Sequence, residues 1–221
     1  MLHYLLQFYK YALNCINMPR IRRTDYSIGG YATYFFSSDA YIDGVLKANR
    51  FKHDVNITMT NGGKAQADYY LNGIGAAIEG GYHYLFDNNL FVEPYARGVF
   101  YIGDGKKVTL DNGMEAKTGN DRSVRLEVGA SVGKTYTLSS GKTIQPYLKV
   151  AFEREMVNAN HVTINNQHRF NNAFQGNLGR YGVGLDSRVG KDLTIYAEVD
   201  YQNGQYIESP VMANIGLRYN F

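Results

Sequence analysis

Apolar and polar residues alternate along most of this 221-residue chain. The clearest stretch is the last one, in which Val211, Ile215 and Leu217 fall on one face and Asn214 and Arg218 on the other. Successive side chains of a β-strand point to opposite faces, so a period of two predicts strands with one apolar and one polar face. The pattern predicts nine strands, near residues 26–36, 40–56, 73–83, 90–100, 124–133, 144–153, 181–189, 193–202 and 211–221.

The connections between the predicted strands alternate in length, because a short turn recurs about every 50 residues and a long polar segment lies between turns. Transmembrane β-barrels show this pattern, with short periplasmic turns and longer outer loops. A soluble β-sandwich also alternates along its strands, but charges on nearly every polar face and the regular turn spacing favour the membrane barrel. The short turns are centred near residues 38, 88, 140 and 191, and the long segments lie near 57–68, 102–120 and 157–173.

The composition fits a wall between lipid and water. The chain has 20 Tyr, each with an apolar ring and a polar tip, and 24 Gly, which suit strands that bend and close. The chain contains no run of 18 apolar residues, so no transmembrane helix is predicted. The mean hydropathy of −0.36 suits strands in which only every second residue faces lipid. The net charge of +3 gives little reason to expect nucleic acid, and a single cysteine, Cys15, excludes an internal disulfide.

Several separate strings of the chain carry a family resemblance. The end of the chain, Tyr196–Phe221, contains Asn-Ile-Gly-Leu-Arg-Tyr-Asn-Phe. It resembles the final hairpin of bacterial autotransporter translocator domains, and the resemblance covers about residues 24–221. The resemblance implies a 12-stranded barrel in the outer membrane of a Gram-negative bacterium, with about nine strands present here. The earlier strings that match in the same order are Tyr41–Phe51, Gly73–Tyr84, Phe91–Phe100 and Ile144–Glu155.

The same resemblance implies a function and partners. The family exports a passenger polypeptide joined to the N-terminus of the barrel, by type V secretion. Outer-membrane lipid, the barrel assembly machinery and the passenger are therefore the expected partners. In the family a C-terminal aromatic residue helps the assembly machinery to recognise the last strand. Phe221, Tyr219 and Leu217 match that assembly signal.

Charged residues on the polar faces are expected to line the lumen of the barrel. Paired acids there could transfer protons, and in some family members acidic lumen residues promote self-cleavage of a linker helix. A polar lumen in which acids and bases pair with one another explains the same residues. The part of the chain that resembles the family does not include the linker helix that would be cleaved, so no catalytic residue is assigned. The residues expected to face the lumen are Glu79, Glu93, Arg97, Arg125, Glu127, Lys149, Glu153, Asp186, Arg188, Glu198, Asp200 and Arg218.

Other chemistry is not expected. Gly133-Lys134-Thr135 looks like the end of a phosphate loop, but Val128 stands where such a loop needs its first glycine. The five histidines form no metal-binding spacing, so neither a metal nor another cofactor is predicted. We therefore expect a translocator that is not an enzyme. Two alternatives stay open: an outer-membrane enzyme on a small barrel, and a stand-alone adhesin-like or porin-like barrel.

Residues 1–23 do not fit the barrel pattern, because Leu5-Leu6 and Phe8-Tyr9 place apolar groups on both faces of a strand. We expect an atypical non-barrel segment that could be helical, followed by a partial barrel domain over residues 24–221. The segment lacks the pattern of a signal peptide. Nine strands is an odd number, which would leave residues 1–23 on the outer side of the membrane unless residues 4–13 form a tenth strand. These features predict a truncated remnant of a longer autotransporter, without independent export activity.

Overall fold

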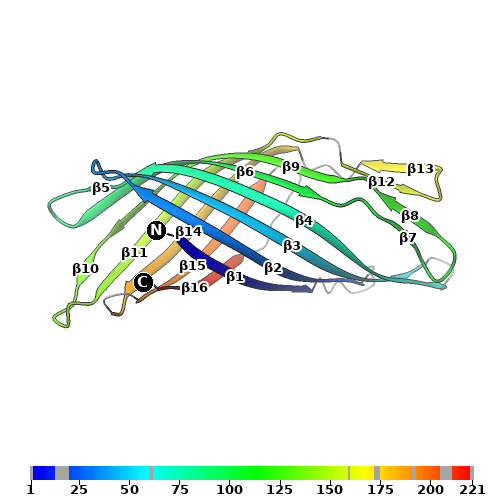
Figure 1. Ribbon diagram of the computed structural model, residues 1–221, viewed down its shortest axis with the longest axis horizontal. Coiled ribbons are helices and arrows are strands. Elements are labelled where there is room, and N and C mark those ends of the chain that lie inside the picture. Colours follow the sequence, from blue (N-terminus) through cyan, green and yellow to red (C-terminus); the bar gives the residue numbers. More distant parts are fainter. Residues whose placement is uncertain are drawn as a thin grey trace.

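A computed structural model describes residues 2–12, 20–59, 62–158, 160–171, 175–190, 193–204 and 211–219. Within these residues every regular element is a β-strand. The main sheet is antiparallel throughout and curls across its width (Figure 1). The all-β antiparallel fold that the alternation predicts is therefore confirmed.

Ten strands follow one another along the path of the main sheet, each antiparallel to the next. Two short strands, β5 (Tyr84–Leu85) and β10 (Tyr136–Thr137), pair with β6 and β11 beside the short turns. The ten strands are β1 (Leu2–Ala12), β2 (Arg20–Phe35), β3 (Ala40–Thr58), β4 (Lys64–Tyr82), β6 (Leu90–Gly103), β9 (Asp121–Lys134), β11 (Thr143–Glu155), β14 (Gly176–Arg188), β15 (Leu193–Gly204) and β16 (Met212–Tyr219).

The additional strand is β1, and it corrects two expectations. The expected non-barrel segment contains an edge strand, with partners running from Leu2 opposite Ala32 to Ala12 opposite Arg22. Strand pairing uses backbone N–H and C=O groups, so it does not require the alternation that this segment lacks. The path therefore has an even number of strands within the described residues. Its first and last residues both lie at the end with the short turns, where Figure 1 marks N and C, so the odd-number argument was wrong.

The short turns occur where the sequence predicts them. Each is closed by a backbone hydrogen bond, such as Phe36 N–H to the Ala40 carbonyl oxygen at 2.8 Å and Phe86 N–H to the Leu90 carbonyl oxygen at 2.8 Å. Asp39 is in the left-handed region with φ of 64°, a conformation that Asp, Asn and Gly tolerate better than other residues. These turns fix the register of the hairpins on either side.

Two of the predicted long polar segments contain further strands. They form a second, four-stranded sheet at the far end from the short turns (Figure 1). Strands of three or four residues are too short to show a period in the sequence. The order of this small sheet is β13 (His168–Asn171), β12 (His161–Ile164), β8 (Glu115–Thr118) and β7 (Lys107–Thr109).

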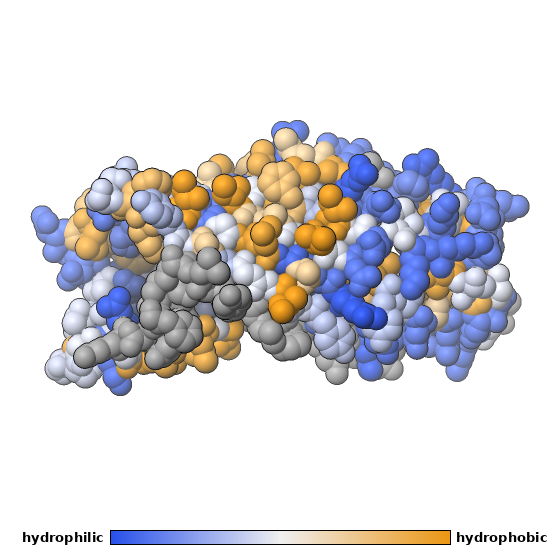
Figure 2. Space-filling model, viewed as in Figure 1, coloured by the Kyte–Doolittle hydropathy of each residue, from blue (hydrophilic) through white to orange (hydrophobic). Residues whose placement is uncertain are grey.

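β3 and β4 are 19 residues long, although a barrel strand needs only about 9–11 residues to cross a membrane. On the outward face of β3, Leu46 is the last large apolar side chain. Near the end of the strand, the outward positions are occupied by Lys52, Asp54 and Asn56. The end of β3 beyond Phe51 therefore extends past the apolar band. Figure 2 shows apolar side chains over the middle of the molecule and polar side chains over the end with the small sheet.

Aromatic rings on the inner face pack over glycines of the neighbouring strand. Tyr95 lies directly opposite Gly129, and a Cβ at Gly129 would come within 2.7 Å of the Tyr95 hydroxyl. Tyr147 covers Gly184 in the same way. These positions need glycine because any side chain would occupy the place of the ring.

Candidate functional site

The candidate site is the polar inner face of the curled sheet. Its centre is a row of directly opposed residues: Glu79 pairs with Arg97, Arg97 with Glu127, and Glu127 with Glu153. Opposed residues of neighbouring strands share a face, so the strand register brings four charges from β4, β6, β9 and β11 into one line. We call these four residues the central row.

Arg97 joins the first half of the central row. Its Nε donates a hydrogen bond to Glu79 Oε2 at 2.6 Å, and its Nη1 lies 3.6 Å from Glu127 Oε1. A guanidinium presents donors in a fixed fork, so a single arginine can serve two carboxylates at once. Both acids therefore have a cation on the same side.

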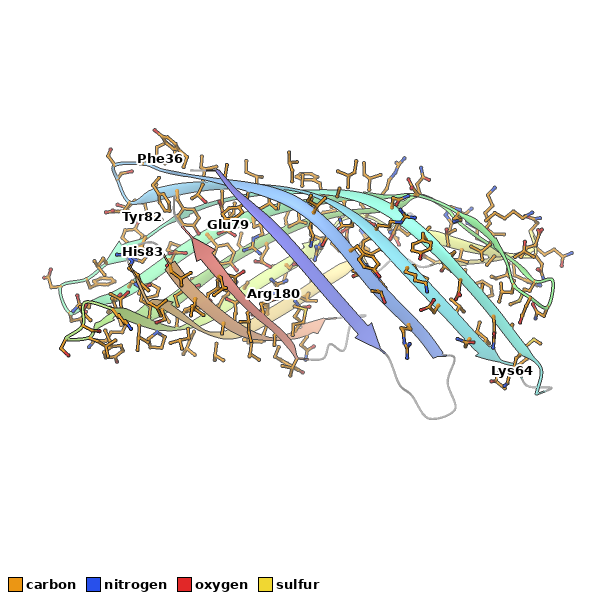
Figure 3. All side chains as sticks on the ribbon, turned by 60° about the horizontal axis from the view of Figure 1, so that its bottom comes forward. Phe36, Lys64, Glu79, Tyr82, His83 and Arg180 are labelled. Carbon is orange, nitrogen blue, oxygen red and sulfur yellow. The ribbon has the colours of Figure 1, made fainter. Side chains whose placement is uncertain are left out.

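Arg180 of β14 holds the second half of the row, where two acids face each other. Its Nη1 lies 3.2 Å from Glu127 Oε2, and its Nη2 lies 3.1 Å from Glu153 Oε2 (Figure 3 labels Glu79 and Arg180). The Glu127 side chain is only 2% exposed. Like charges opposite each other destabilise a sheet, so Arg180 offsets the repulsion that the register creates. Arg125 adds a second cation to Glu153, at 3.3 Å.

Tyrosine hydroxyls complete the hydrogen bonds of three acids. Tyr95 crosses Gly129 and donates to Glu127 at 2.8 Å, and Tyr41 donates to Glu79 at 2.8 Å. A tyrosine that covers a glycine thus also satisfies an acid on the inner wall. In a third such pair, the Tyr147 hydroxyl of β11 donates to Glu198 of β15 at 2.7 Å, further along the same inner face.

A second cluster occupies the inner face of β11 and β15. The Lys149 ammonium lies 3.3 Å from Glu198 Oε1, and both side chains are mostly buried. Asp200 is 2% exposed, and within the described part of the chain its Oδ1 has no hydrogen-bond partner. This cluster continues the central row around the inner face.

A third group lies nearer the short turns. His83 Nδ1 is 2.9 Å from Glu93 Oε2, and the His83 ring stacks on Phe91 with centroids 5.1 Å apart (Figure 3 labels His83). The Tyr41 hydroxyl is also 3.2 Å from Glu93, which links this group to Glu79.

At the opposite end, His53 lies past the apolar band. Its ring stacks on Tyr69, with centroids 5.0 Å apart and planes 6° from parallel. Burial, assisted by the nearby positive charge of Arg23, lowers the pKa of His53. A cavity of about 780 Å³ opens here, between the inner wall and residues of the small sheet such as Thr118 and His161.

The expected lumen residues fall into three classes. Asp186 is half-buried and Arg188 is exposed, and both lie near the end of β14. The Arg218 and Phe221 side chains lie outside what the structure describes, whereas Leu217 is 69% exposed on the apolar outer face. The structure brings together the remaining nine: Glu79, Glu93, Arg97, Arg125, Glu127, Lys149, Glu153, Glu198 and Asp200.

Arg180 is the main residue that the sequence reasoning missed. It lies two residues before Gly182 on the same face, so extending the alternation by one step upstream would have found it. The tyrosine–glycine pairs depend on which residues stand opposite each other, and that register is not visible in one strand alone.

Neither a metal site nor a membrane-spanning helix is found in the described parts of the chain. No group of three or more His, Cys, Asp and Glu side chains there could hold a metal ion. No helix there is both long and apolar enough to cross a bilayer.

Comparison with known proteins gives one consistent result. The family model described as "Autotransporter beta-domain" matches residues 20–200. The chain is 37% identical over 197 residues to "Autotransporter CRAC" of Citrobacter rodentium, covering 88% of the chain and 12% of that protein. It is 36% identical over 217 residues to "Autotransporter adhesin/invasin TibA" of Escherichia coli, covering 97% of the chain and 22% of that protein. The chain thus spans less than a quarter of the length of each of these relatives.

Solved structures agree with the sequence relatives. The β domain of the Bordetella autotransporter BrkA superposes with a TM-score of 0.82 at 25% identity, covering 100% of this chain and 83% of that one. The translocator domain of NalP from Neisseria meningitidis has a TM-score of 0.63 at 15% identity, and this likeness concerns the fold alone.

Proposed function

Because this chain belongs to the autotransporter β-domain family, we propose that it forms the outer-membrane wall through which a passenger polypeptide is exported or by which it is anchored. The observation that carries the proposal is the inner face with its central row. Apolar side chains cover the other face of the same strands, as in a barrel wall between lipid and water.

The pairing of the inner charges suits the passage of a polypeptide. Glu127 and Glu153 are each held by arginines at close range, so little unpaired charge remains on this part of the wall. A passing chain with charges of either sign would meet weaker net attraction than it would from isolated acids or bases. The wall remains polar and can be wetted by water.

The same pairing supports a translocator that is not an enzyme. A general acid or base must reach the group whose proton it moves. Glu79, Glu127 and Glu198 are instead occupied by tyrosine hydroxyls and cations. An outer-membrane enzyme or an adhesin-like barrel would require further reactive or binding groups near the small sheet.

The proposal includes assembly by the barrel assembly machinery through the last strand. Leu217 is exposed on the apolar face of β16, and Tyr219 pairs through its backbone with Leu193 at the short-turn end. Phe221 lies outside the described residues and completes the proposed signal. Lipid, this machinery and the passenger are the partners.

Export is proposed to need a closed barrel, in which the first and last strands also pair with each other. Among the described residues, β1 pairs with β2 and β16 pairs with β15, and no pairing joins β1 to β16. An open edge in lipid leaves backbone N–H and C=O groups without partners, at a cost of several kcal/mol each. We therefore expect no export from these residues by themselves.

The test compares two proteins in cells. One is the full-length gene product with an epitope at the N-terminus of its mature form, and the other is residues 1–221 with the same epitope behind a signal peptide. Added protease should remove the epitope from intact cells only in the complete product. Both samples are also checked for a heat-modifiable outer-membrane species. A folded complete barrel whose epitope stays protected would refute translocation, and surface exposure from residues 1–221 alone would refute the need for closure.

A further inference from the structure

A groove of about 820 Å³ lies on the outward face of β2, β3, β4 and β6. Ala48 is directly opposite Ile28 on one side and Ile74 on the other. The two isoleucines are 65% and 68% exposed, so they stand as walls on either side of a residue that has only a methyl group. We call this feature the outer groove, with Ala48 as its floor. Ile102 continues the row on β6, opposite Ile74.

The outer groove changes from apolar to polar within two residues. Arg50 follows Ala48 on the same face of β3, about 7 Å further along the strand. Arg50 lies opposite Tyr26 and Asn72, and the Asn72 side-chain amide donates to Asp104 at 3.2 Å. The apolar floor therefore ends at a row that offers one cation, two hydrogen-bonding groups and one acid.

Two exposed cations flank Tyr70 at this boundary. The Arg50 guanidinium lies 4.7 Å from the centroid of the Tyr70 ring, and Lys106 Nζ donates to the Tyr70 backbone carbonyl at 3.3 Å. A third cation, Lys52, stands directly opposite Tyr70 in the strand pairing, but its ammonium is held by Asp54 at 3.1 Å. Arg50 and Lys106 are thus the cations that are positioned to meet an anion at the rim of the groove.

We propose that the outer groove binds a phosphorylated glycolipid of the membrane leaflet next to the small sheet. An acyl chain lies over Ala48, a phosphate group is held by Arg50 and Lys106, and sugar hydroxyls bond to Asn72 and Asp104. Arginine matches the geometry of phosphate oxygens, and lysine adds a point charge. Asp104 would repel phosphate, but it accepts hydrogen bonds from hydroxyl groups, so the row favours a sugar that carries phosphate over a simple phosphate.

The placement of these groups commits the site to a lipid. A soluble phosphate or nucleotide would make no use of an apolar floor of this length, whereas an amphiphile uses both halves of the groove at once. The inference rests on the proposed outer-membrane placement of the barrel, but it concerns the lipid-facing side and not the passage of the passenger.

The test measures lipid bound to the complete protein after purification from outer membranes in detergent. The protein is exchanged into phosphatidylcholine micelles that contain a bisphosphorylated, acylated glucosamine disaccharide, and native mass spectrometry gives the fraction that retains it. The double variant R50Q/K106Q should bind about tenfold less, because two charge-assisted contacts are lost. The same lipid without phosphates should bind both proteins equally. A48L fills the floor and should weaken binding of both lipids.

The matched control is K134Q/K142Q. Lys134 also lies near a tyrosine ring, 5.8 Å from the centroid of Tyr136, but at the short-turn end of the barrel. An equal loss in the control, or unchanged retention in R50Q/K106Q, would overturn the proposal. So would displacement of the lipid by inorganic phosphate alone, or a dimer cross-linked through I74C that excludes the lipid. Failure of passenger export with normal lipid binding would count against the proposed function only.

Discussion

Replacing Arg180 by methionine should destabilise the barrel more than replacing any single acid that it contacts. Met keeps much of the length and apolar volume of the side chain but removes both contacts, at 3.2 Å to Glu127 and 3.1 Å to Glu153. The two carboxylates then face each other across β9 and β11 with 2% and 9% of their side chains exposed.

The expected loss follows from the burial of these groups. Breaking a buried ion pair by removing one partner costs about 3–5 kcal/mol. Arg97 still approaches Glu127 at 3.6 Å and Arg125 approaches Glu153 at 3.3 Å, so some compensation remains. We therefore expect the free energy of unfolding to fall by about 2–3 kcal/mol.

The assay is urea unfolding of the folded barrel in detergent, followed by the loss of its heat-modifiable band. The double variant R180M/E153Q removes the facing charge and should recover most of the loss, since coupled residues are not additive. R180K should be intermediate, because a single ammonium cannot bridge both acids as a fork. An R180M midpoint equal to that of the wild type, or no recovery in the double variant, would refute the role given to Arg180.

Three further predictions follow from the inner wall and the ends of the barrel. G184A should lower the free energy of unfolding by about 2 kcal/mol, because the new Cβ displaces the Tyr147 ring and breaks its bond to Glu198. G44A should be near neutral in the same urea assay, because its Cβ would meet only the Ala32 carbonyl oxygen, at 4.0 Å. Because the pKa of His53 is lowered in the folded protein, the unfolded chain binds a proton first as the pH falls through about 6.5. Stability should therefore drop below that pH. Unfolding midpoints measured above and below it should differ less in H53Q than in the wild type. Deleting Phe221 should reduce the amount of folded protein in outer-membrane fractions. Y136A removes an aromatic ring that is 53% exposed at the short-turn end, and it should not have this effect. If the two changes had equal effects, Phe221 would serve only as an aromatic anchor at the interface.

The strands of the barrel wall could be predicted from the sequence because one face of the wall is apolar and the other polar, so apolar and polar residues alternate along each strand. The sequence did not predict β1, since edge pairing through the backbone leaves no such alternation in Leu5-Leu6 and Phe8-Tyr9. The strands of the small sheet were also missed, because three or four residues cannot establish alternation.

The candidate site was predictable in its faces but not in its contacts. Alternation placed Glu127 and Glu153 on the polar side, but only the register shows that they are opposed and need Arg180. Tyr95 shares the polar face of its strand with Glu93 and Arg97, yet its role in covering Gly129 and bonding Glu127 depends on a neighbouring strand. Cross-strand relations of this kind are properties of the pairing, which local patterns do not encode.

The length of β3 and β4 sets where an exported chain would leave the protein. The end of β3 beyond Phe51 reaches Thr58, and at about 3.3 Å per residue it adds on the order of 20 Å along the strand. In the proposed translocator, the exit would therefore have a raised wall on the side of β3 and β4. On that side an emerging segment would still run along a polar wall after it has passed the apolar band, so it would reach open solution later there than beside the shorter strands.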